Sequence, residues 1–296
     1  MRWPSLCRRR PPPEGPHDRL GAGDAGVALP RNLFGSRRPD PPHGRLGPRR
    51  SPSRRSRLQG AGARPAAGLR HRSGPRRPGR EHQVIALVDY GAGNLRSVRN
   101  ALDTLEVESV IATTPQELAG ADAIVFPGVG AAAPAMAALR GRRMDRALID
   151  AIRRGTPFLG ICLGLQLLFE RSAEDGATCL GILSGTVDRL ETAEKLPHVG
   201  WNTVDAVAPH PVTAGLEGKA MYFTHSYVVA PQDRSVVAGQ TIHGVPFVSA
   251  VAVDTLVGVQ FHPERSGSAG LGLLGNFVRF ANQERARAAQ ADHSLP

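Results

Sequence analysis

From residue 84 onward the chain alternates between short apolar runs and segments in which apolar residues recur every three or four positions. Residues 84–88 (VIALV) are all apolar, and after a glycine-containing turn the apolar positions are Leu95, Val98, Leu102 and Leu105. A short continuous apolar run is typical of a buried strand, whereas spacings of three and four are typical of one face of a helix. The pattern predicts a strand, a turn and a helix at the start of this region.

The same alternation extends over the first half of this region. Thr114 before Pro115, with Glu117 close behind, predicts the start of a further helix. The pattern also predicts strands within 108–113, 121–130 and 156–164, and helices at about 131–139 and 144–154. Strands that alternate with helices and are apolar almost throughout indicate a parallel sheet covered on both faces.

Shorter segments with strand character follow Thr178. They lie at 179–190, 198–204, 220–230, 245–253 and 255–264, and an amphipathic helix is predicted at 270–284. We find no internal repeat. The expected fold class is therefore α/β, with a mostly parallel central sheet flanked by helices in a flavodoxin-like, three-layer arrangement.

The charge of the chain is concentrated in its first part. The formal net charge is +11, but residues 1–82 hold 20 arginines and only five acidic residues, whereas residues 83–296 hold 17 basic and 21 acidic residues. The first part also contains 14 prolines and 12 glycines, and it buries too little apolar surface to offset its chain entropy. We expect a disordered Arg/Pro/Gly-rich extension at 1–82 and a folded domain at 83–296.

The basic extension has several interpretations. A nucleic-acid-binding arm is one, but Trp3 and Phe34 are its only aromatic residues, and base stacking depends on aromatic side chains. Its high proline content is unlike that of a transit peptide. Translation of GC-rich DNA upstream of a start codon gives the same bias. We therefore expect a mis-assigned start or a non-functional extension rather than a nucleic-acid partner.

The cysteine and hydropathy patterns exclude several protein classes. Cys7, Cys162 and Cys179 form no CxxC motif or Cys/His cluster, so neither a zinc site nor a disulfide framework is indicated. No stretch reaches the roughly 18 apolar residues of a membrane span. We expect a soluble, cytoplasmic domain with no metal and no other cofactor.

Cys162 stands in the most apolar part of the chain, in the sequence GICLGLQLLF. It follows a predicted strand, and Gly160 and Gly164 flank it at two positions on either side. This is the spacing of a nucleophile elbow, in which glycines permit a tight turn and a following helix N-terminus favours the thiolate. Free cysteines are also common core residues, so the motif alone leaves both interpretations open.

Two other loops offer the groups that a cysteine nucleophile needs. His262 directly follows a late apolar strand, and Glu264 stands two positions further on. In extended chain these side chains would face the same way, so the carboxylate would fix the imidazole tautomer. The glycine-rich loop PGVG at 127–130 offers backbone N–H groups to an oxyanion, with the N–H of Leu163 as the other donor. Each loop alone has an ordinary structural interpretation, but the combination favours catalysis.

Six stretches extend this combination: DYGAGNLRSV, PGVG, CLGLQLLF, LPHVGWN, YFTHSY and FHPERSG. Together they resemble the triad (class I) glutamine amidotransferases, and the finer motifs are similar to those of the glutaminase subunits of imidazole glycerol phosphate synthases. The resemblance covers residues 84–282. It implies that glutamine is hydrolysed to glutamate and ammonia. The ammonia would feed a separate (β/α)8-barrel cyclase in a heterodimer, for a step of histidine biosynthesis.

The resemblance also implies roles for individual residues. Cys162 matches the nucleophile, His262 the general acid and base, and Glu264 its orienting carboxylate. The positions that match the oxyanion strand or the glutamine-binding residues are Gly128, Val129, Gly130, Gln166, Glu174, Ser226 and Tyr227. The positions that match the partner face or the ammonia exit are Asn94, Trp201, Tyr222 and Arg265. In this family the oxyanion strand is expected to turn its N–H inward only when the partner binds.

Some of these residues have simpler interpretations. Trp201 and Tyr222 could be core aromatics, Asn94 a helix cap, and Glu174 a solvent-facing acid. The chain also departs from the family pattern, with Ala132 where an aromatic residue is frequent, Arg265 in place of the usual lysine and Ser184 in place of a frequent proline. Arginine keeps the charge but is planar and bulkier.

Two alternative functions remain to be weighed. A glutaminase subunit for another acceptor, as in anthranilate or p-aminobenzoate synthesis, would have PGG rather than PGVG in the oxyanion loop. A non-catalytic scaffold on the same fold would lack a member of the triad, but Cys162, His262 and Glu264 are all present.

Overall fold

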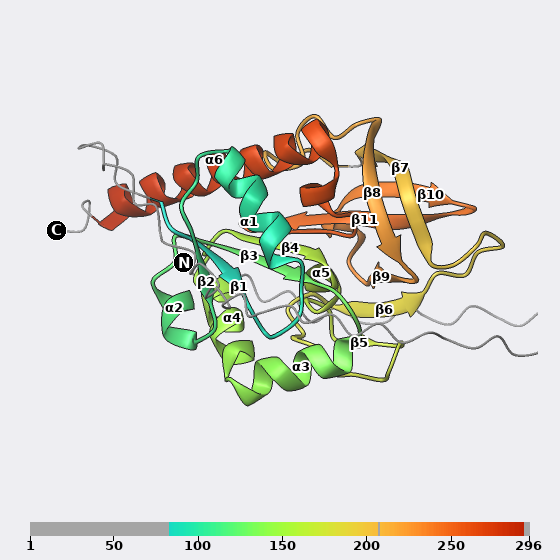
Figure 1. The fold of residues 1–296 in the computed structure, drawn as a ribbon, viewed down its shortest axis with the longest axis horizontal. Coiled ribbons are helices and arrows are strands. Elements are labelled where there is room, and N and C mark those ends of the chain that lie inside the picture. Colours follow the sequence, from blue (N-terminus) through green and yellow to red (C-terminus); the bar gives the residue numbers. More distant parts are fainter. Residues whose placement is uncertain (1–82, 207, 293–296) are drawn as a thin grey trace, which may run out of the picture. The chain divides into compact units, whose positions relative to one another are not determined.

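The computed structural model describes residues 83–206 and 208–292 (Figure 1). The extension expected at residues 1–82, and with it the predicted boundary between the two parts, lies outside the described residues.

The strands of the described residues form one mixed sheet. Its parallel half runs in the order β2 (Ser109–Ala112), β1 (Ile85–Val88), β3 (Ala123–Gly128), β4 (Phe158–Cys162) and β12 (Leu256–Val259). Antiparallel strands continue it as β11 (Val245–Val253), β10 (Val237–His243), β7 (His198–Ala206) and β8 (Lys219–His225). The expected parallel sheet is therefore present, and an antiparallel extension lies beside it.

Three further strands lie off this path. They are β5 (Arg171–Ser172), β6 (Gly185–Arg189) and β9 (Tyr227–Pro231); β9 pairs with both β6 and β11. They place the segment around Tyr227 beside the main sheet.

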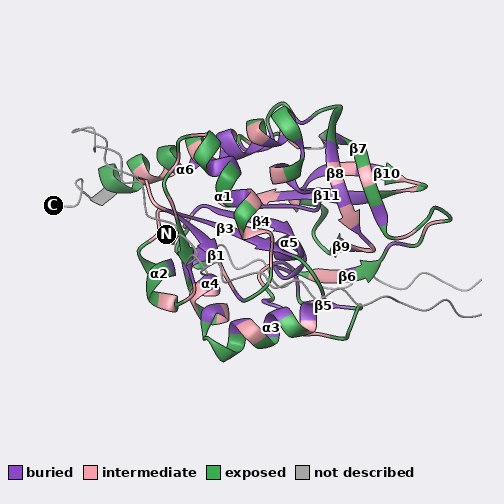
Figure 2. Cartoon of the chain, viewed as in Figure 1, coloured by how far each residue is buried: buried purple, intermediate pink, exposed green. Residues whose placement is uncertain are grey.

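Helices cover both faces of the parallel half, as expected for a three-layer fold (Figure 1). One face is covered by α1 (Leu95–Thr104) and α6 (Gly267–Asp292), and the other by α2 (Pro115–Ala119), α3 (Ala132–Gly141) and α4 (Met144–Arg153). Ala86 and Val88 of β1 pack into the core on the second face, while Ile85 and Leu87 pack into the core on the first. The parallel strands are thus buried on both sides (Figure 2), which explains their continuous apolar runs.

Local signals in the sequence explain where several elements begin. At the start of α2 the Thr114 side chain accepts a hydrogen bond from the Glu117 amide, and the Glu117 carboxylate accepts one from the Thr114 amide. This capping box, with Pro115 in the first turn, confirms the predicted helix start.

The antiparallel half differs from the expectation in two places. The segment with strand character at 220–230 is divided at Ser226 into β8 and β9, which pair with different neighbours. β10 was not predicted, because Gly239 and Gln240 interrupt its apolar pattern; the register with β11 shifts at the same place. Both differences arise from tertiary pairing that local periodicity does not report.

Candidate active site

Three neighbouring strands bring the predicted catalytic loops together. β4 lies between β3 and β12 in the sheet, and Gly128 at the end of β3 lies opposite Cys162 at the end of β4. His262 follows β12. Because the carboxyl ends of parallel strands meet at one edge, the glycine-rich loop, the cysteine and the histidine share that edge.

Cys162 occupies the tight turn that the glycine spacing predicts. Its backbone has φ 54° and ψ −109°, a conformation that a residue with a side chain adopts only under constraint. A Cβ on Gly160 would lie 2.8 Å from the carbonyl oxygen of Gly164, and one on Gly164 would lie 1.9 Å from that of Phe126. The two glycines therefore permit the close approach of β3, β4 and the chain after the cysteine.

The helix that follows Cys162 is short. α5 (Leu163–Gln166) has only four residues, so few peptide dipoles align toward the sulfur and their effect on the thiolate is small. The side chains of Leu165 in α5 and of Leu167, Leu168 and Phe169 directly after it are completely buried. These residues anchor the elbow to the core, but activation of the cysteine must come from its side-chain neighbours.

His262 and Glu264 form the expected pair. The Nδ1 atom of His262 lies 2.9 Å from Oε1 of Glu264, and the carboxylate side chain is completely buried. The contact was predicted correctly, but the reason was wrong, since Glu264 lies in a 3-10 turn, Pro263–Arg265, rather than in extended chain. The turn after Pro263 folds the carboxylate back under the ring.

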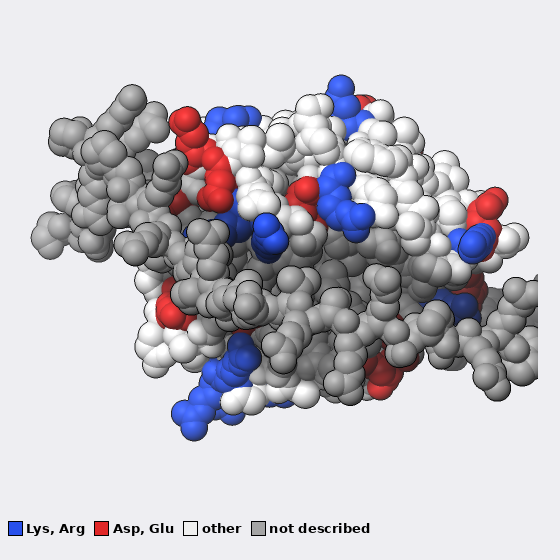
Figure 3. Space-filling model, viewed as in Figure 1, with Lys and Arg blue, Asp and Glu red and all other residues white. Residues whose placement is uncertain are grey.

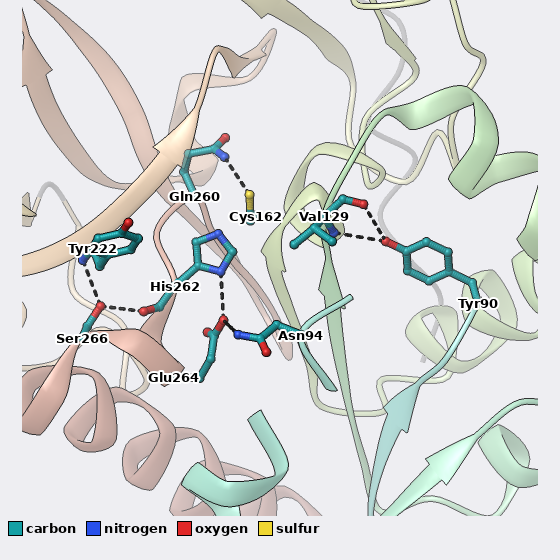
Figure 4. A network of polar contacts seen from close by, with 9 residues as sticks. All are labelled: Tyr90, Asn94, Val129, Cys162, Tyr222, Gln260, His262, Glu264 and Ser266. Carbon is teal, nitrogen blue, oxygen red and sulfur yellow. Dashed lines mark hydrogen bonds and ion pairs between the residues drawn. The ribbon is translucent and has the colours of Figure 1, made fainter. Parts of the chain in front are cut away.

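The second ring nitrogen of His262 faces the cysteine. In Figure 4 the imidazole lies between Glu264 and Cys162, and its Nε2 atom is buried without a hydrogen-bond partner among the described residues. Burial lowers the pKa of His262, but the interactions with Cys162 and Glu264 outweigh it and raise the pKa to about 10. A histidine in this state can take the thiol proton and return it to a leaving group.

The backbone around His262 is held by neighbouring elements. Its N–H donates to the carbonyl of Tyr222 on β8 at 2.8 Å, and its carbonyl accepts from the Ser266 hydroxyl at 2.6 Å. The same hydroxyl accepts from the Tyr222 amide at 3.0 Å (Figure 4). The backbone of His262 is therefore hydrogen-bonded to β8 in the antiparallel half of the sheet, and it also follows β12 in the chain.

The predicted oxyanion loop lies beside Cys162, but one of its donors is already engaged. The Val129 N–H donates to the hydroxyl of Tyr90 at 3.2 Å, and the Val129 side chain is 40% exposed. Gly130 follows with φ 89°. Leu163, the other predicted donor, directly follows the cysteine as the first residue of α5 and is buried.

A buried amide network connects Gln166 to the cysteine. The Gln166 Nε2 atom donates to the Tyr227 carbonyl at 3.0 Å and to Oε1 of Gln260 at 3.2 Å. Gln260 in turn directs its Nε2 atom at the sulfur of Cys162, at 3.6 Å (Figure 4). A single side chain, that of Gln260, therefore connects Gln166 to the sulfur of Cys162. The Tyr227 carbonyl lies beside Gln166.

Two buried histidines orient that segment. Nδ1 of His225 lies 3.1 Å from the Tyr227 carbonyl, and Nδ1 of His198 lies 3.1 Å from Nε2 of His225. Burial, with a smaller effect of neighbouring histidines, lowers the pKa of His225 to about 3 and that of His198 to about 4. Both rings are neutral near pH 7, so each can donate one hydrogen bond along this series. The adjacent Ser226 carbonyl accepts from the amide of Leu190 at 2.9 Å.

Glu174 lies on an exposed loop after β5. The neighbouring Asp175 carboxylate accepts a hydrogen bond from the Ala133 amide at 2.6 Å, in the first turn of α3. This contact ties the loop to the helix that directly follows the PGVG loop. Glu174 is therefore held near the oxyanion loop, although 12 residues separate it from Cys162 in the sequence.

The residues assigned to a partner face are only partly in the core. Trp201 is 59% exposed and lies edge-on to Tyr222, with ring centroids 6.1 Å apart. The Arg265 guanidinium lies over the Tyr222 ring at 4.2 Å, which is a cation–π contact. Trp201 is thus not a core aromatic residue.

Asn94 reaches the triad itself. It stands at the N-cap of α1, yet its side chain makes no capping hydrogen bond. Its Nδ2 atom instead lies 3.5 Å from Oε1 of Glu264 (Figure 4). The simpler interpretation of Asn94 as a helix cap is therefore wrong.

Sequence reasoning missed three residues of this site: Gln260, Ser266 and Tyr90. Gln260 had a signal, because it is a single polar residue in the apolar run before His262 and is completely buried. Ser266 and Tyr90 had none, since the Ser266 hydroxyl accepts from Tyr222 of β8 and the Tyr90 hydroxyl accepts from Val129, contacts between residues 44 and 39 positions apart.

Other sites are not indicated within residues 83–206 and 208–292. No group of three or more His, Cys, Asp or Glu side chains in this part of the chain is arranged to hold a metal ion, and no helix in it is long and apolar enough to cross a membrane. Among the described residues in the view of Figure 3, basic and acidic side chains are interspersed.

Comparisons with known proteins agree with this geometry. The sequence profile of the family described as glutamine amidotransferase class-I matches residues 86–279. A relative from Dehalococcoides mccartyi (strain CBDB1), named imidazole glycerol phosphate synthase subunit HisH, is 46% identical over 200 residues, which is 67% of this chain and 98% of the relative. A protein of the same name from a Cyanothece species is 48% identical over 200 residues, covering 66% and 95%.

Solved structures share the fold at lower identity. A crystal structure described as a glutamine amidotransferase aligns with a TM-score of 0.55 at 20% identity, over 67% of this chain and 98% of that one. A glutamine amidotransferase from Thermotoga maritima aligns with a TM-score of 0.52 at 16% identity, over 68% and 99%.

Proposed function

The chain belongs to the class I glutamine amidotransferase family, and from this premise we propose that Cys162, His262 and Glu264 hydrolyse glutamine to supply ammonia to a cyclase subunit. The function is that of the glutaminase subunit of imidazole glycerol phosphate synthase, in line with relatives of that name that are about 45% identical over nearly their whole length. The family match at 86–279 supports a single amidotransferase domain at 83–296.

The first chemical step forms a thioester. His262 holds the proton of the Cys162 thiol, and the thiolate attacks the side-chain amide carbon of glutamine. The amide oxygen becomes an oxyanion, which the N–H groups of Leu163 and of the 129–130 loop stabilise. Glu264, 2.9 Å from the imidazole, stabilises the imidazolium that carries the proton.

The second step releases ammonia. When the tetrahedral intermediate collapses, the carbon–nitrogen bond breaks and His262 gives its proton to the leaving nitrogen. The carbon–sulfur bond remains, and a γ-glutamyl thioester is left on Cys162. His262 is then neutral and ready to act as a base.

The third step regenerates the enzyme. A water molecule attacks the thioester carbon while His262 takes one of its protons, and the carbon–sulfur bond breaks. Glutamate leaves, and the thiolate and imidazolium are restored. One histidine therefore serves all three steps, which requires that its ring stay fixed between Cys162 and Glu264.

Glutamine is bound next to this triad. Gln166, Glu174, Ser226 and Tyr227 form the expected binding residues. The buried hydrogen bonds from Gln166 and His225 to the Tyr227 carbonyl support this assignment, because they fix the backbone that would meet the α-amino and α-carboxylate groups of the substrate.

The ammonia passes to a separate cyclase subunit, which we propose is a (β/α)8 barrel. Exposed apolar side chains support a docking face around β7, β10 and the oxyanion loop: Val129, Val199, Trp201 and Ile242. Large apolar side chains that are exposed to solvent together favour protein–protein contact. We assign Asn94, Tyr222 and Arg265 to the ammonia exit, in line with the contacts of Asn94 with Glu264, of Tyr222 with the His262 backbone and of Arg265 with the Tyr222 ring. The complex would form imidazole glycerol phosphate and aminoimidazole carboxamide ribotide.

One observation carries the proposal: the imidazole of His262 lies between a completely buried carboxylate and a cysteine on a strained turn. The test is to quench a glutamine reaction in acid and to measure the mass of the peptide that contains Cys162. We expect a γ-glutamyl adduct on Cys162 that disappears as glutamate is released. Steady glutamate release with no adduct on Cys162 would contradict the mechanism.

A further inference from the structure

The hydroxyl of Tyr90 is hydrogen-bonded to the loop that should stabilise the oxyanion. It accepts from the Val129 N–H at 3.2 Å and donates to the Val129 carbonyl at 3.4 Å. In Figure 4 these contacts lie on the side of Val129 away from Cys162. The Val129 N–H is therefore directed away from the sulfur and is already engaged.

Tyr90 itself is firmly placed. The residue is 4% exposed, and its ring packs edge-on against Phe126 of β3, with centroids 5.7 Å apart. Burial, as the largest cause, raises the pKa of Tyr90 to about 12. The hydroxyl thus keeps its proton near pH 7 and can both donate and accept.

The peptide that Tyr90 holds is the less constrained partner. The Val129 N–H belongs to the peptide between Gly128 and Val129, so its direction depends on rotation at Gly128 and at the exposed Val129. Glycine permits backbone rotation at low steric cost. The Val129 peptide can therefore turn while the Tyr90 ring stays fixed.

We propose that Tyr90 is a positioning residue of the glutaminase reaction, whose hydroxyl holds the Val129 peptide with its N–H turned away from Cys162. The second oxyanion donor becomes available only when this bond breaks. A partner protein that covers the exposed Val129 side chain acts on the same peptide, so its binding competes with the Tyr90 bond. The proposal rests on the proposed glutaminase function.

The size of the effect follows from one buried hydrogen bond. Such a bond shifts a conformational equilibrium about threefold to tenfold, whereas an oxyanion donor that is permanently in place contributes roughly 100-fold to 1,000-fold to kcat. Loss of the Tyr90 hydroxyl should therefore recover only part of the rate that the second donor provides.

The test is Tyr90→Phe in the full chain, with glutamate release measured alone and with the cyclase subunit. The ring contact with Phe126 is retained and only the hydroxyl is lost. We expect kcat without the cyclase to rise about threefold to tenfold, KM for glutamine to stay within about twofold, and kcat with the cyclase to stay unchanged. The ratio of stimulated to basal kcat should fall accordingly.

Thr213→Val is the matched control. It also removes one buried hydroxyl, which donates to the His210 carbonyl at 3.3 Å and lies outside the catalytic and binding residues. We expect basal kcat to be unchanged in this variant. An equal rise of basal kcat in both variants would show that loss of any buried hydroxyl raises kcat, and it would overturn the role of Tyr90.

Other outcomes are equally decisive. A Tyr90→Phe variant with normal thermal stability and unchanged or reduced basal kcat would overturn the inference while leaving the triad intact. If Tyr90→Phe does not fold, amide hydrogen exchange of the wild-type chain replaces it. Exchange at Val129 should change when the cyclase binds, and identical exchange in both states would overturn the inference. Activity that survives Cys162→Ala would instead contradict the proposed function.

Discussion

Replacing Glu264 by glutamine removes the charge that faces the catalytic imidazole while keeping the shape of the side chain. The wild-type pKa of His262 is raised from 6.5 to about 10. This difference corresponds to about 5 kcal/mol in favour of the protonated ring, and Cys162 and Glu264 share it. In Glu264→Gln one of the two partners is gone, whereas burial still disfavours the charge. We expect the pKa of His262 to fall by at least about one unit.

The kcat for glutamate release should also fall in Glu264→Gln, because the substitution changes the tautomer of the His262 ring. An amide can donate to Nδ1 of His262 and would then place the ring proton on Nε2, where it blocks transfer from the thiol. The analogous loss in a catalytic triad costs up to about 10,000-fold in kcat, and we expect a fall of roughly 100-fold to 10,000-fold here. KM for glutamine should change little, because the hydrogen bond between Gln166 and Tyr227, the residues proposed to bind glutamine, does not involve Glu264.

The pH dependence of stability gives a second readout. The folded state holds a proton on His262 between about pH 6.5 and 10 that the unfolded state has lost. This stabilisation is fully present below about pH 6.5 and is lost as the pH rises through that window. In Glu264→Gln the folded-state pKa of His262 should be lower. The pH at which this stabilisation is completely lost should therefore fall, while the lower limit of the window near pH 6.5 stays the same.

The assay combines kcat from glutamate release with an NMR titration of the His262 ring. Glu284→Gln is the matched control, since Glu284 lies on α6 and pairs with Arg287 away from the site. That variant should have the wild-type kcat and the wild-type pKa of His262. A Glu264→Gln enzyme with wild-type kcat and an unchanged imidazole pKa would refute the assigned role of the carboxylate.

Three further predictions concern stability and assembly. Gly164→Ala places a Cβ 1.9 Å from the Phe126 carbonyl oxygen, so the free energy of unfolding should fall by about 3 kcal/mol. Gly272→Ala, in α6 with nothing within 4 Å of the added Cβ, should instead raise it by up to about 1 kcal/mol in the same denaturation experiment. His225 has a pKa of about 3 in the folded state, so unfolding takes up its proton between about pH 3 and 6.5 and stability rises with pH there. His225→Gln should lower that slope by about 1.4 kcal/mol per pH unit, and an unchanged slope would contradict the neutral buried ring. Trp201→Ala should weaken binding to the cyclase by about tenfold or more, measured by titration calorimetry, without changing basal kcat; equal affinity would place the docking face elsewhere.

The parallel half of the fold and the meeting of Cys162, His262 and Glu264 could be predicted because they follow local rules. The strands β1, β3 and β4 are apolar on both faces, and the reactive residues stand where these runs end. Cys162 and His262 therefore stood out as polar or reactive groups directly after buried strands. The common edge of a parallel sheet then brings them together without further information.

Other features depend on contacts between distant segments. The His262–Glu264 contact was expected from extended geometry, but the structure forms it through a 3-10 turn after Pro263. The elbow helix has only one turn, and the continuous apolar run that extends beyond it gives no local sign of where the helix ends. Tyr90 lies 39 residues from Val129, and no local pattern indicates such a contact.

The central claim is that Cys162 generates ammonia from glutamine for the cyclase subunit. The most direct measurement compares glutamine with ammonium salts as the nitrogen source, using the Cys162→Ala chain in complex with the cyclase. We expect that product formation from ammonium is retained while product formation from glutamine is abolished. Glutamine-dependent product formation that survives in Cys162→Ala would contradict it.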